Sequence, residues 1–307
     1  MTIERKSAFT LSDLAKFDDT RLREVICERS GAAHPAQVGM AIGGEQRDGA
    51  LARLADRIER ALAPASRETF VRARWSAATD QERAAANDAV LNCLAWDLTY
   101  WKTPDEYERL TAGEQVHLGA LDFARLDGGV ALDAGCGSGR ITFPLARRAR
   151  RTYAMDPAPP LLHMLESKLA AANMPQVEIL RAEFSRISLP DDSVDAAICC
   201  SSFGPLEARG GVSGLHELQR VTRPGGRIVI IWPEDPDWFL RQGFHYTILP
   251  GRLTITFASL DEACAVARRF YGETALRYLE ATGQPELPYH ILKLRAPRDL
   301  CWLTVQK

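Results

Sequence analysis

The stretch Val130-Ala-Leu-Asp-Ala-Gly-Cys-Gly-Ser-Gly-Arg140 decides the fold of this chain. Its apolar start leads into an aspartate, Asp133, and then into three glycines at alternate positions. This order is typical of a strand followed by a ligand-binding turn, because glycine lacks the Cβ atom that would block a tight reversal or a close ligand. A Gly-rich turn can also be a plain connection, and the sequence that follows separates the two interpretations.

A second short strand is predicted at Arg151-Thr-Tyr-Ala-Met-Asp156, and it also ends in a carboxylate. Asp156 follows the first acid by about one strand, helix and strand unit, a place where a carboxylate suits the hydroxyls of a ribose. A nicotinamide-binding dehydrogenase is the alternative, but its fingerprint is G-x-G-x-x-G. Counted from Gly135, Arg140 stands where that fingerprint needs its third glycine. The sequence therefore disfavours a dehydrogenase.

Two further motifs follow in order. Residues 182–195, Ala-Glu-Phe-Ser-Arg-Ile-Ser-Leu-Pro-Asp-Asp-Ser-Val-Asp, contain an acid, a short loop and a run into another strand. Residues 217–227 combine a helical pattern with a Pro-Gly-Gly turn, and the apolar run 228–232 comes next. With these four motifs, the chain resembles the class I S-adenosylmethionine-dependent methyltransferases from about Tyr100 to Trp232. Glu183 stands where that family usually has an aspartate.

The resemblance implies that S-adenosylmethionine is the cofactor and methyl donor. The first glycine turn would hold it, Asp156 would bind its sugar, and Glu183 would accept a hydrogen bond from its adenine amino group. Ligands of parallel sheets bind at the carboxyl ends of the strands, where the acids of these motifs are expected to converge. The expected cofactor-binding residues are Asp133, Gly135, Gly137, Gly139, Asp156, Pro157, Glu183, Phe184 and Cys200.

Short apolar runs alternate with helical patterns from Val130 onward, which predicts an α/β fold with a parallel sheet. The five strands predicted in this way are residues 130–134, 152–156, 177–182, 195–200 and 228–232. A capping box at Ser259-Leu-Asp-Glu262 predicts a helix to about Thr282, and the apolar runs 289–294 and 299–305 predict a closing hairpin. With the resemblance, this implies a Rossmann-like, seven-stranded, mostly parallel sheet with an antiparallel last strand.

The predicted core begins only near residue 115, so a large N-terminal part has a different role. Helix-start signals at Thr103-Pro-Asp-Glu106 and Thr111-Ala-Gly-Glu114 predict that residues 1–114 form a helical N-terminal extension or cap. Residues 115–307 are predicted to form the cofactor-binding core. Within this core, an insertion at about residues 233–258 is expected on the substrate side.

Aromatic residues gather close to the expected site. Tyr100, Trp101 and Tyr107 lie just before the core, and Trp232 ends the fifth predicted strand. In the resembling family this region often shapes the substrate pocket, so these rings are candidate walls for an aromatic or cationic substrate. The alternative is a hydrophobic seam, because Trp96 and Tyr100 are four residues apart on one helical face.

A sulfonium methyl group is already activated, so alignment of the acceptor alone removes on the order of 7 kcal/mol or more from a barrier. A phenol or alcohol gains from a base, whereas a carboxylate or neutral amine needs none. His245 and Glu234 are the candidate bases, because both follow the fifth predicted strand.

Composition narrows the class of protein. The chain has 307 residues, 46% of them hydrophobic, and a formal net charge of -2, with a pI near 6.3. These values argue against a nucleic-acid or membrane-surface partner. No apolar run is long enough to span a bilayer and the start lacks a signal-peptide core, so a cytoplasmic location is expected. Seven cysteines without a C-x-x-C pair predict neither a disulfide framework nor a metal site.

The sequence thus predicts an enzyme that transfers a methyl group from S-adenosylmethionine to an oxygen or nitrogen of a small molecule. After the fourth strand, residues 199–205 lack the Asn/Asp-Pro-Pro-Tyr/Phe run of the family's adenine-N6 and glutamine-amide methylating members. The basic run 147–151 is explained by the end of a helix, where cations complement the dipole. An RNA or protein methyltransferase, or a non-catalytic adaptor, are the alternatives, and a homodimer through the helical extension stays open.

Overall fold

The computed structural model describes residues 96, 99–100, 103–205 and 209–307 of the chain. Contacts between Cα atoms place Thr103–Lys307 in one compact unit and Trp96, Thr99 and Tyr100 in another. The first unit contains the sheet. Residues 1–95 lie outside the described part, so the helical extension and its boundary at residue 114 stay predictions.

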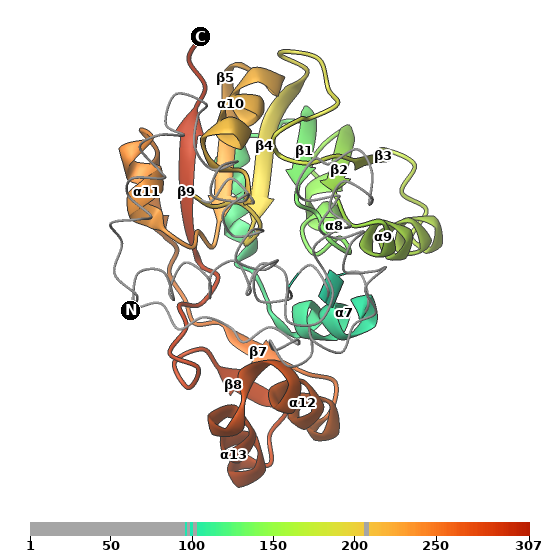
Figure 1. Ribbon diagram of the computed structural model, residues 1–307, viewed down its shortest axis with the longest axis vertical. Helices are drawn as coiled ribbons and strands as arrows, with labels where there is room; N and C mark the ends of the chain where they lie inside the picture. Colours follow the sequence, from blue (N-terminus) through green and yellow to red (C-terminus); the bar gives the residue numbers. More distant parts are fainter. Residues whose placement is uncertain (1–95, 97–98, 101–102, 206–208) are drawn as a thin grey trace, which may run out of the picture. The chain divides into compact units, whose positions relative to one another are not determined.

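The sheet has seven strands in the order β3-β2-β1-β4-β5-β9-β6 (Figure 1). Its strands are β1 Val130–Ala134, β2 Arg151–Asp156, β3 Val177–Arg181, β4 Val194–Cys200, β5 Thr222–Ile231, β6 His245–Ile248 and β9 Asp299–Thr304. The first five strands pair in parallel, and β9 runs antiparallel to β5 and β6. The predicted Rossmann-like, mostly parallel sheet is therefore confirmed, with all five predicted parallel strands.

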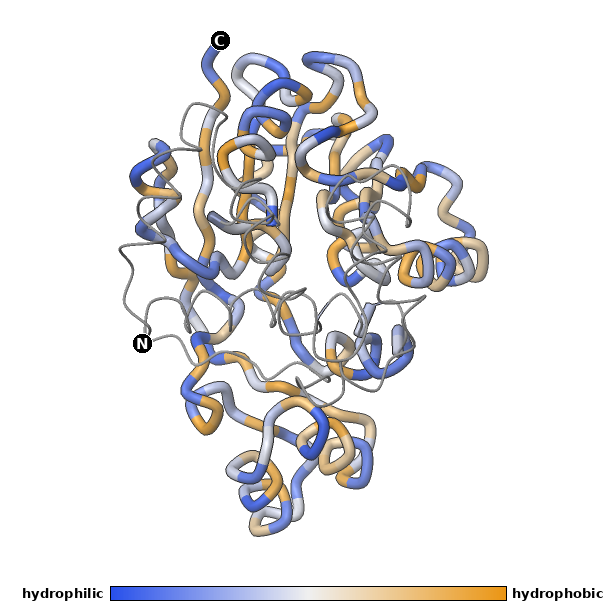
Figure 2. Tube along the Cα trace, viewed as in Figure 1, coloured by the Kyte–Doolittle hydropathy of each residue, from blue (hydrophilic) through white to orange (hydrophobic). Residues whose placement is uncertain are grey.

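Helices cover both faces of this sheet, and this explains why its central strands are hydrophobic throughout (Figure 2). On one face the core includes buried residues of α10 (Gly211–Val221) and α11 (Pro236–Arg241). On the other face η3 (Leu118–Ala124), α8 (Thr142–Ala146) and α9 (Pro159–Ala171) contribute. A parallel sheet buried on both sides fixes the ends of its strands firmly, so loops at the carboxyl edge start from rigid positions.

A smaller group of elements lies beyond the edge at which β4 ends (Figure 1). We call residues 254–288 the small-sheet subdomain. It comprises β7 Thr254–Thr256, α12 Leu260–Val266, the π-helical η5 Ala267–Tyr271, α13 Glu273–Thr282 and β8 Glu286–Pro288. β7 and β8 form a two-stranded antiparallel sheet. Helix α7 (Pro104–Gly113) packs on α12, so the subdomain and α7 together cover the carboxyl edge.

The predicted hairpin of residues 289–294 and 299–305 is wrong in its first strand. Residues 289–294 form turns, in which the N–H groups of Leu292 and Leu294 both donate to Tyr289 O at 3.1 Å. The sixth strand is β6, inside the segment that was predicted as an insertion. Tyr289 and Leu292 are buried in this turn. The apolar run at residues 289–294 therefore reflects the burial of a turn, and not a strand.

The predicted helix starts had mixed outcomes. Ser259 caps α12 as predicted, because its Oγ accepts a hydrogen bond from Glu262 N at 3.1 Å. The helix that follows is broken at Gly272, which has φ 80°. Thr103 precedes α7 without a side-chain cap. The start predicted at Thr111 is wrong, because Thr111 lies in the last turn of α7 and its hydroxyl donates to a carbonyl of the preceding turn.

Candidate functional site

The glycine turn after β1 is shaped by its contacts with the protein. Gly135, Gly137 and Gly139 all have positive φ, at 76°, 54° and 102°. A Cβ atom at Gly135 would lie 2.4 Å from Ser202 Cβ, and one at Gly139 would lie 2.5 Å from Leu165 Cδ1. Two of the three glycines are therefore required by packing of the turn against the loop after β4 and against α9. This bears out the expected tight reversal of the backbone, and the expected approach of a ligand to the turn stays a prediction.

The carboxylate at the end of β2 braces the same turn. Asp156 Oδ2 accepts a hydrogen bond from Gly137 N, and its Oδ1 accepts one from Ala158 N, both at 2.9 Å. The side chain is 8% exposed. Asp156 thus fixes the middle glycine relative to β2, and the predicted closeness of the two motifs is confirmed by a direct contact.

Asp133 is the second buried carboxylate of the turn. Its Oδ2 accepts a hydrogen bond from Thr142 Oγ1 at 2.6 Å, whereas its Oδ1 is buried without a hydrogen-bond partner among the described residues. The pKa of Asp133 is raised to about 7, chiefly by burial; the hydrogen bond from Thr142 and the charge of Arg140 lower it, and the charge of Asp156 raises it. A buried carboxylate oxygen without a donor is suited to a cationic group of a ligand, such as an α-ammonium.

Arg140, directly after the third glycine, links the turn to α7 and the small-sheet subdomain. Its Nη1 lies 3.2 Å from Glu114 Oε2, and the Glu114 side chain is fully buried. The other oxygen of that carboxylate accepts a hydrogen bond from Tyr271 at 2.8 Å. Arg140 Nη2 also contacts Cys200 Sγ at 3.6 Å. Burial alone would lower the pKa of Arg140, but the charges of Cys200 and Glu114 raise it above its ordinary value.

The sequence reasoning did not find this Arg140 to Glu114 pair. The two residues are far apart in the sequence, and Glu114 was assigned to a helix start that does not exist. The one available signal was the unusual arginine after the glycine motif.

The other expected cofactor residues also lie at the carboxyl edge. Cys200 ends β4, Pro157 follows β2, and Glu183 is exposed after the end of β3. Phe184 packs edge-on against Phe203, with 5.0 Å between ring centroids and 79° between planes. The Phe184 ring also lies 3.2 Å from the position of a Cβ on Gly135. The structure thus brings Phe184 against the glycine turn.

The expected substrate-facing aromatics fall into different places. Tyr107, on α7, lies with its hydroxyl 3.3 Å from the position of a Cβ on Gly137. Tyr100 belongs to the other compact unit, where it stacks on Trp96 at 6.0 Å, as their spacing on one helical face predicts. Trp101 lies outside the described residues.

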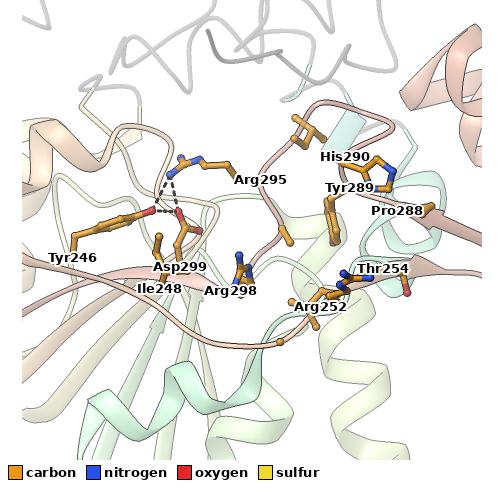
Figure 3. A pocket seen from close by; sticks show the side chains of 14 residues that line it. Tyr246, Ile248, Arg252, Thr254, Pro288, Tyr289, His290, Arg295, Arg298 and Asp299 are labelled. Carbon is orange, nitrogen blue, oxygen red and sulfur yellow. Dashed lines mark hydrogen bonds and ion pairs between the residues drawn. The ribbon is translucent and has the colours of Figure 1, made fainter.

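Trp232 follows β5 and contacts Tyr289 and Arg295, two of the residues that line a cavity of about 640 Å³ (Figure 3). Its indole N–H donates to Arg295 O at 2.9 Å, and its ring meets the cavity residue Tyr289 edge-on at 5.8 Å. Because Trp232 directly follows β5, this wall of the cavity lies at the carboxyl edge of the sheet. The remaining walls come from β6, the segment 251–254 and the connection into β9.

Neither candidate base is placed for proton abstraction in this cavity. His245 stacks on Trp302 at 4.3 Å, on the face of β6 opposite to Tyr246 and Ile248, which line the cavity. Glu234 forms an ion pair with Arg209 at 2.7 Å. The structure therefore does not bring His245 to the cavity, because side chains alternate along a strand, and it engages Glu234 elsewhere.

No described helix has both the length and the hydropathy to cross a bilayer. The described residues also form no group of three or more His, Cys, Asp and Glu side chains suited to a metal ion.

A seven-stranded sheet of this order, with a Gly-rich turn after β1 and an acid after β2, defines a Rossmann-like nucleoside-binding fold. The profile of the methyltransferase domain family matches residues 131–226. Residues 131–226 therefore correspond to a methyltransferase domain. The matched range contains most of β1, all of β2 to β4 and the first part of β5, and with them the three glycines of the turn, Asp133, Asp156 and Glu183.

Several curated proteins are similar to this chain. An uncharacterized methyltransferase of Mycobacterium tuberculosis is 34% identical over 101 residues, covering 33% of this chain and 38% of its own length. A demethylmenaquinone methyltransferase of Bacillus velezensis is 29% identical over 179 residues, covering 53% and 74%. A solved SAM-dependent methyltransferase of Aquifex aeolicus has 22% identity and a TM-score of 0.36, covering 49% and 84%. The chain thus spans well under half the length of the mycobacterial relative.

Proposed function

We propose that the protein transfers a methyl group from S-adenosylmethionine to an oxygen or nitrogen nucleophile of a small molecule. The observation that carries the proposal is the glycine turn held between two buried carboxylates, one of which keeps an oxygen without a donor. When bound, the cofactor supplies a methyl group on a positively charged sulfur, which makes the group ready for transfer. The chain's own residues then have to bind, orient and exclude water.

The buried acids fit the two polar ends of such a cofactor. Asp133 Oδ1 would accept a hydrogen bond from the α-ammonium group, which would also stabilise the ionised form of this carboxyl against its raised pKa. Each Asp156 oxygen already accepts one amide hydrogen. A carboxylate oxygen has a second lone pair, so Asp156 can brace the turn and accept a ribose hydroxyl at the same time.

Because His245 faces away from the cavity and Glu234 pairs with Arg209, neither of them is the base of the proposed transfer. His290 is the histidine among the cavity's lining residues. A carboxylate or neutral amine acceptor would need alignment alone, without a base. Similar proteins support a small acceptor. One is named as the malonyl-[acyl-carrier protein] O-methyltransferase of Serratia marcescens, 37% identical over 98 residues, with 32% of this chain and 36% of that protein covered.

Calorimetric titration of the full chain with S-adenosylmethionine and with its demethylated product tests the proposal. Asp133→Asn removes the charge next to the glycine turn, and Asp192→Asn is the matched control on an exposed acid of the same domain. We expect the wild type and D192N to bind both nucleosides, and D133N to bind the donor at least about tenfold more weakly, since one charged hydrogen bond is lost.

The same titration separates the alternatives. A non-catalytic adaptor would bind neither nucleoside, and that result would overturn the proposed function. Equal weakening by D133N and D192N would show that Asp133 has no specific role. An RNA or protein methyltransferase would bind the donor but would show no transfer to small molecules, and its nucleic-acid affinity, if any, would fall steeply with salt.

A further inference from the structure

The cavity that Tyr289 and Arg295 line contains more cations than anions. Three arginines line it, Arg252, Arg295 and Arg298, and Asp299 is the carboxylate among its lining residues. The distribution of hydrogen bonds decides which of the three positive charges a ligand could use.

Arg295 is already committed to the protein. Its Nη1 lies 2.6 Å from Asp299 Oδ2, and its Nη2 donates to Pro233 O at 2.6 Å. Tyr246 also donates to Asp299 Oδ2, at 2.9 Å. Asp299 is only 3% exposed. Figure 3 shows this three-residue group together at one end of the cavity. The buried carboxylate therefore neutralises Arg295 and fixes its orientation.

Arg252 and Arg298 are not neutralised in this way. Arg298 Nη1 donates to the neutral carbonyl of Leu249 at 2.9 Å, and neither arginine forms an ion pair with a residue that the structure describes. A guanidinium has five N–H donors in a fixed fork, so Arg298 keeps donors for a ligand. Two positive charges are thus left at the cavity, which favours an anionic group with paired oxygens.

The rest of the lining is apolar and leads toward the carboxyl edge of the sheet. Ile248, Leu253 and Tyr289 line the cavity, and Tyr289 contacts Trp232 at the end of β5. Trp232 follows β5 at the carboxyl edge of the sheet, so a ligand anchored at the arginines would place its apolar body against Tyr289, on the side of that edge.

We propose that this cavity binds the acceptor as an anionic small molecule, with a carboxylate or phosphate group held by Arg252 and Arg298 and an apolar or aromatic body against Tyr289. This inference rests on the proposed function and specifies its substrate class. Arg295, Asp299 and Tyr246 position the cavity wall without contributing net charge. The sequence indicates an aromatic or cationic substrate, whereas the arginines of the cavity favour a negatively charged one.

The test is a titration of the full chain, saturated with the demethylated donor, with three probes of similar size: benzoate, phenyl phosphate and the neutral benzyl alcohol. The double variant R252Q/R298Q removes both charges. Arg277→Gln is the matched control, because Arg277 is exposed on α13 and pairs with Glu273 away from the cavity lining. The single variant R252Q is included, since Arg252 holds no backbone group and its replacement does not threaten the fold.

We expect at least one anion to bind more tightly than benzyl alcohol, and R252Q/R298Q to weaken that anion at least about tenfold. R277Q should leave the affinity for that anion unchanged, and the affinity of R252Q should lie between those of R277Q and R252Q/R298Q. Whether benzoate or phenyl phosphate binds more tightly identifies the anion. Equal affinity for the anions and the alcohol would overturn this inference, and so would equal anion affinity of R252Q/R298Q and R277Q. In either case, binding of the donor would leave the proposed function standing. Failure to bind the donor would overturn both.

Discussion

At the scale of single residues, Asp133 shows a conflict between stability and function. A carboxyl group with one oxygen buried and without a donor is costly to ionise, which is why its pKa rises to about 7 from 3.8. A ligand with a positive charge would remove this conflict. The motif that contains Asp133 is local in the sequence, so the residue could be found without a structure, whereas its unsatisfied oxygen could not.

This conflict predicts a pH-dependent effect of Asp133→Asn. The folded state holds the Asp133 proton up to a pH of about 7, whereas the unfolded chain releases it near the ordinary aspartate pKa of 3.8. Wild-type stability from this group is therefore greatest at low pH and is lost as the pH rises toward 7. We expect the melting temperature of D133N, relative to wild type, to increase from pH 4 to pH 7. A difference that is constant with pH would contradict the assignment.

Gly139 provides a second residue-scale prediction. A Cβ at this position would lie 2.5 Å from Leu165 Cδ1, so Gly139→Ala should lower the free energy of unfolding by about 1 to 3 kcal/mol through overpacking. Gly128→Ala is the matched control, because Gly128 also has positive φ but open space around its Cβ position. Denaturant melts of both variants separate the cost of the steric clash at residue 139 from the cost of a positive φ, which both positions share. Equal losses would show that backbone strain alone explains the effect.

At the scale of elements, the sequence was informative where an element is buried on both faces. The parallel strands β1 and β4 read as continuous apolar runs and were predicted nearly to their ends. The edge strand β6 has exposed residues at both ends, so nothing in its pattern marked it as a strand. Residues 289–294 carried a false strand signal, because their buried side chains belong to a turn.

The site divides in the same way. The glycine turn and the two acids were predictable because each is part of a contiguous motif. The link from Arg140 through Glu114 to Tyr271 was not, since it joins the turn, the end of α7 and a π-helical segment that are distant in sequence. Residues 252, 295 and 298 were likewise unrecognised as a group, because they are brought together only by the path of the chain around the cavity.

The link predicts how the π-helical segment supports the site. Tyr271→Phe removes the donor to a fully buried carboxylate, so we expect a loss of about 1 to 3 kcal/mol in the free energy of unfolding. Tyr278→Phe is the control on α13, where the hydroxyl makes no hydrogen bond with a described residue. Urea melts of the two variants give the comparison. Indistinguishable stabilities would mean that the Tyr271 hydroxyl contributes nothing to the network.

At the scale of the whole molecule, the rigid sheet and the small-sheet subdomain meet at the glycine turn. Helices on both faces hold the carboxyl ends of the strands, and the buried Arg140 to Glu114 pair ties the covering elements to them. Binding at this junction should therefore stabilise the Thr103–Lys307 unit as a whole. Donor at about 100 times its Kd adds about 2.7 kcal/mol to the free energy of unfolding.

A thermal melt with and without the donor measures this stabilisation. We expect the donor to raise the melting temperature of the wild type and of R252Q/R298Q by several degrees, because the cavity arginines bind the acceptor rather than the donor. D133N should show a clearly smaller rise. A full shift in D133N, or its loss in R252Q/R298Q, would contradict the separation of donor site and acceptor cavity.

The most direct test is an experimental structure of the full chain with the demethylated donor bound. We predict that the α-ammonium group lies within hydrogen-bonding distance of Asp133 Oδ1, that the ribose hydroxyls lie at Asp156, and that the sulfur faces the cavity lined by Tyr289. A nucleoside bound elsewhere on the chain, or one whose ammonium and ribose groups contact neither carboxylate, would contradict the account.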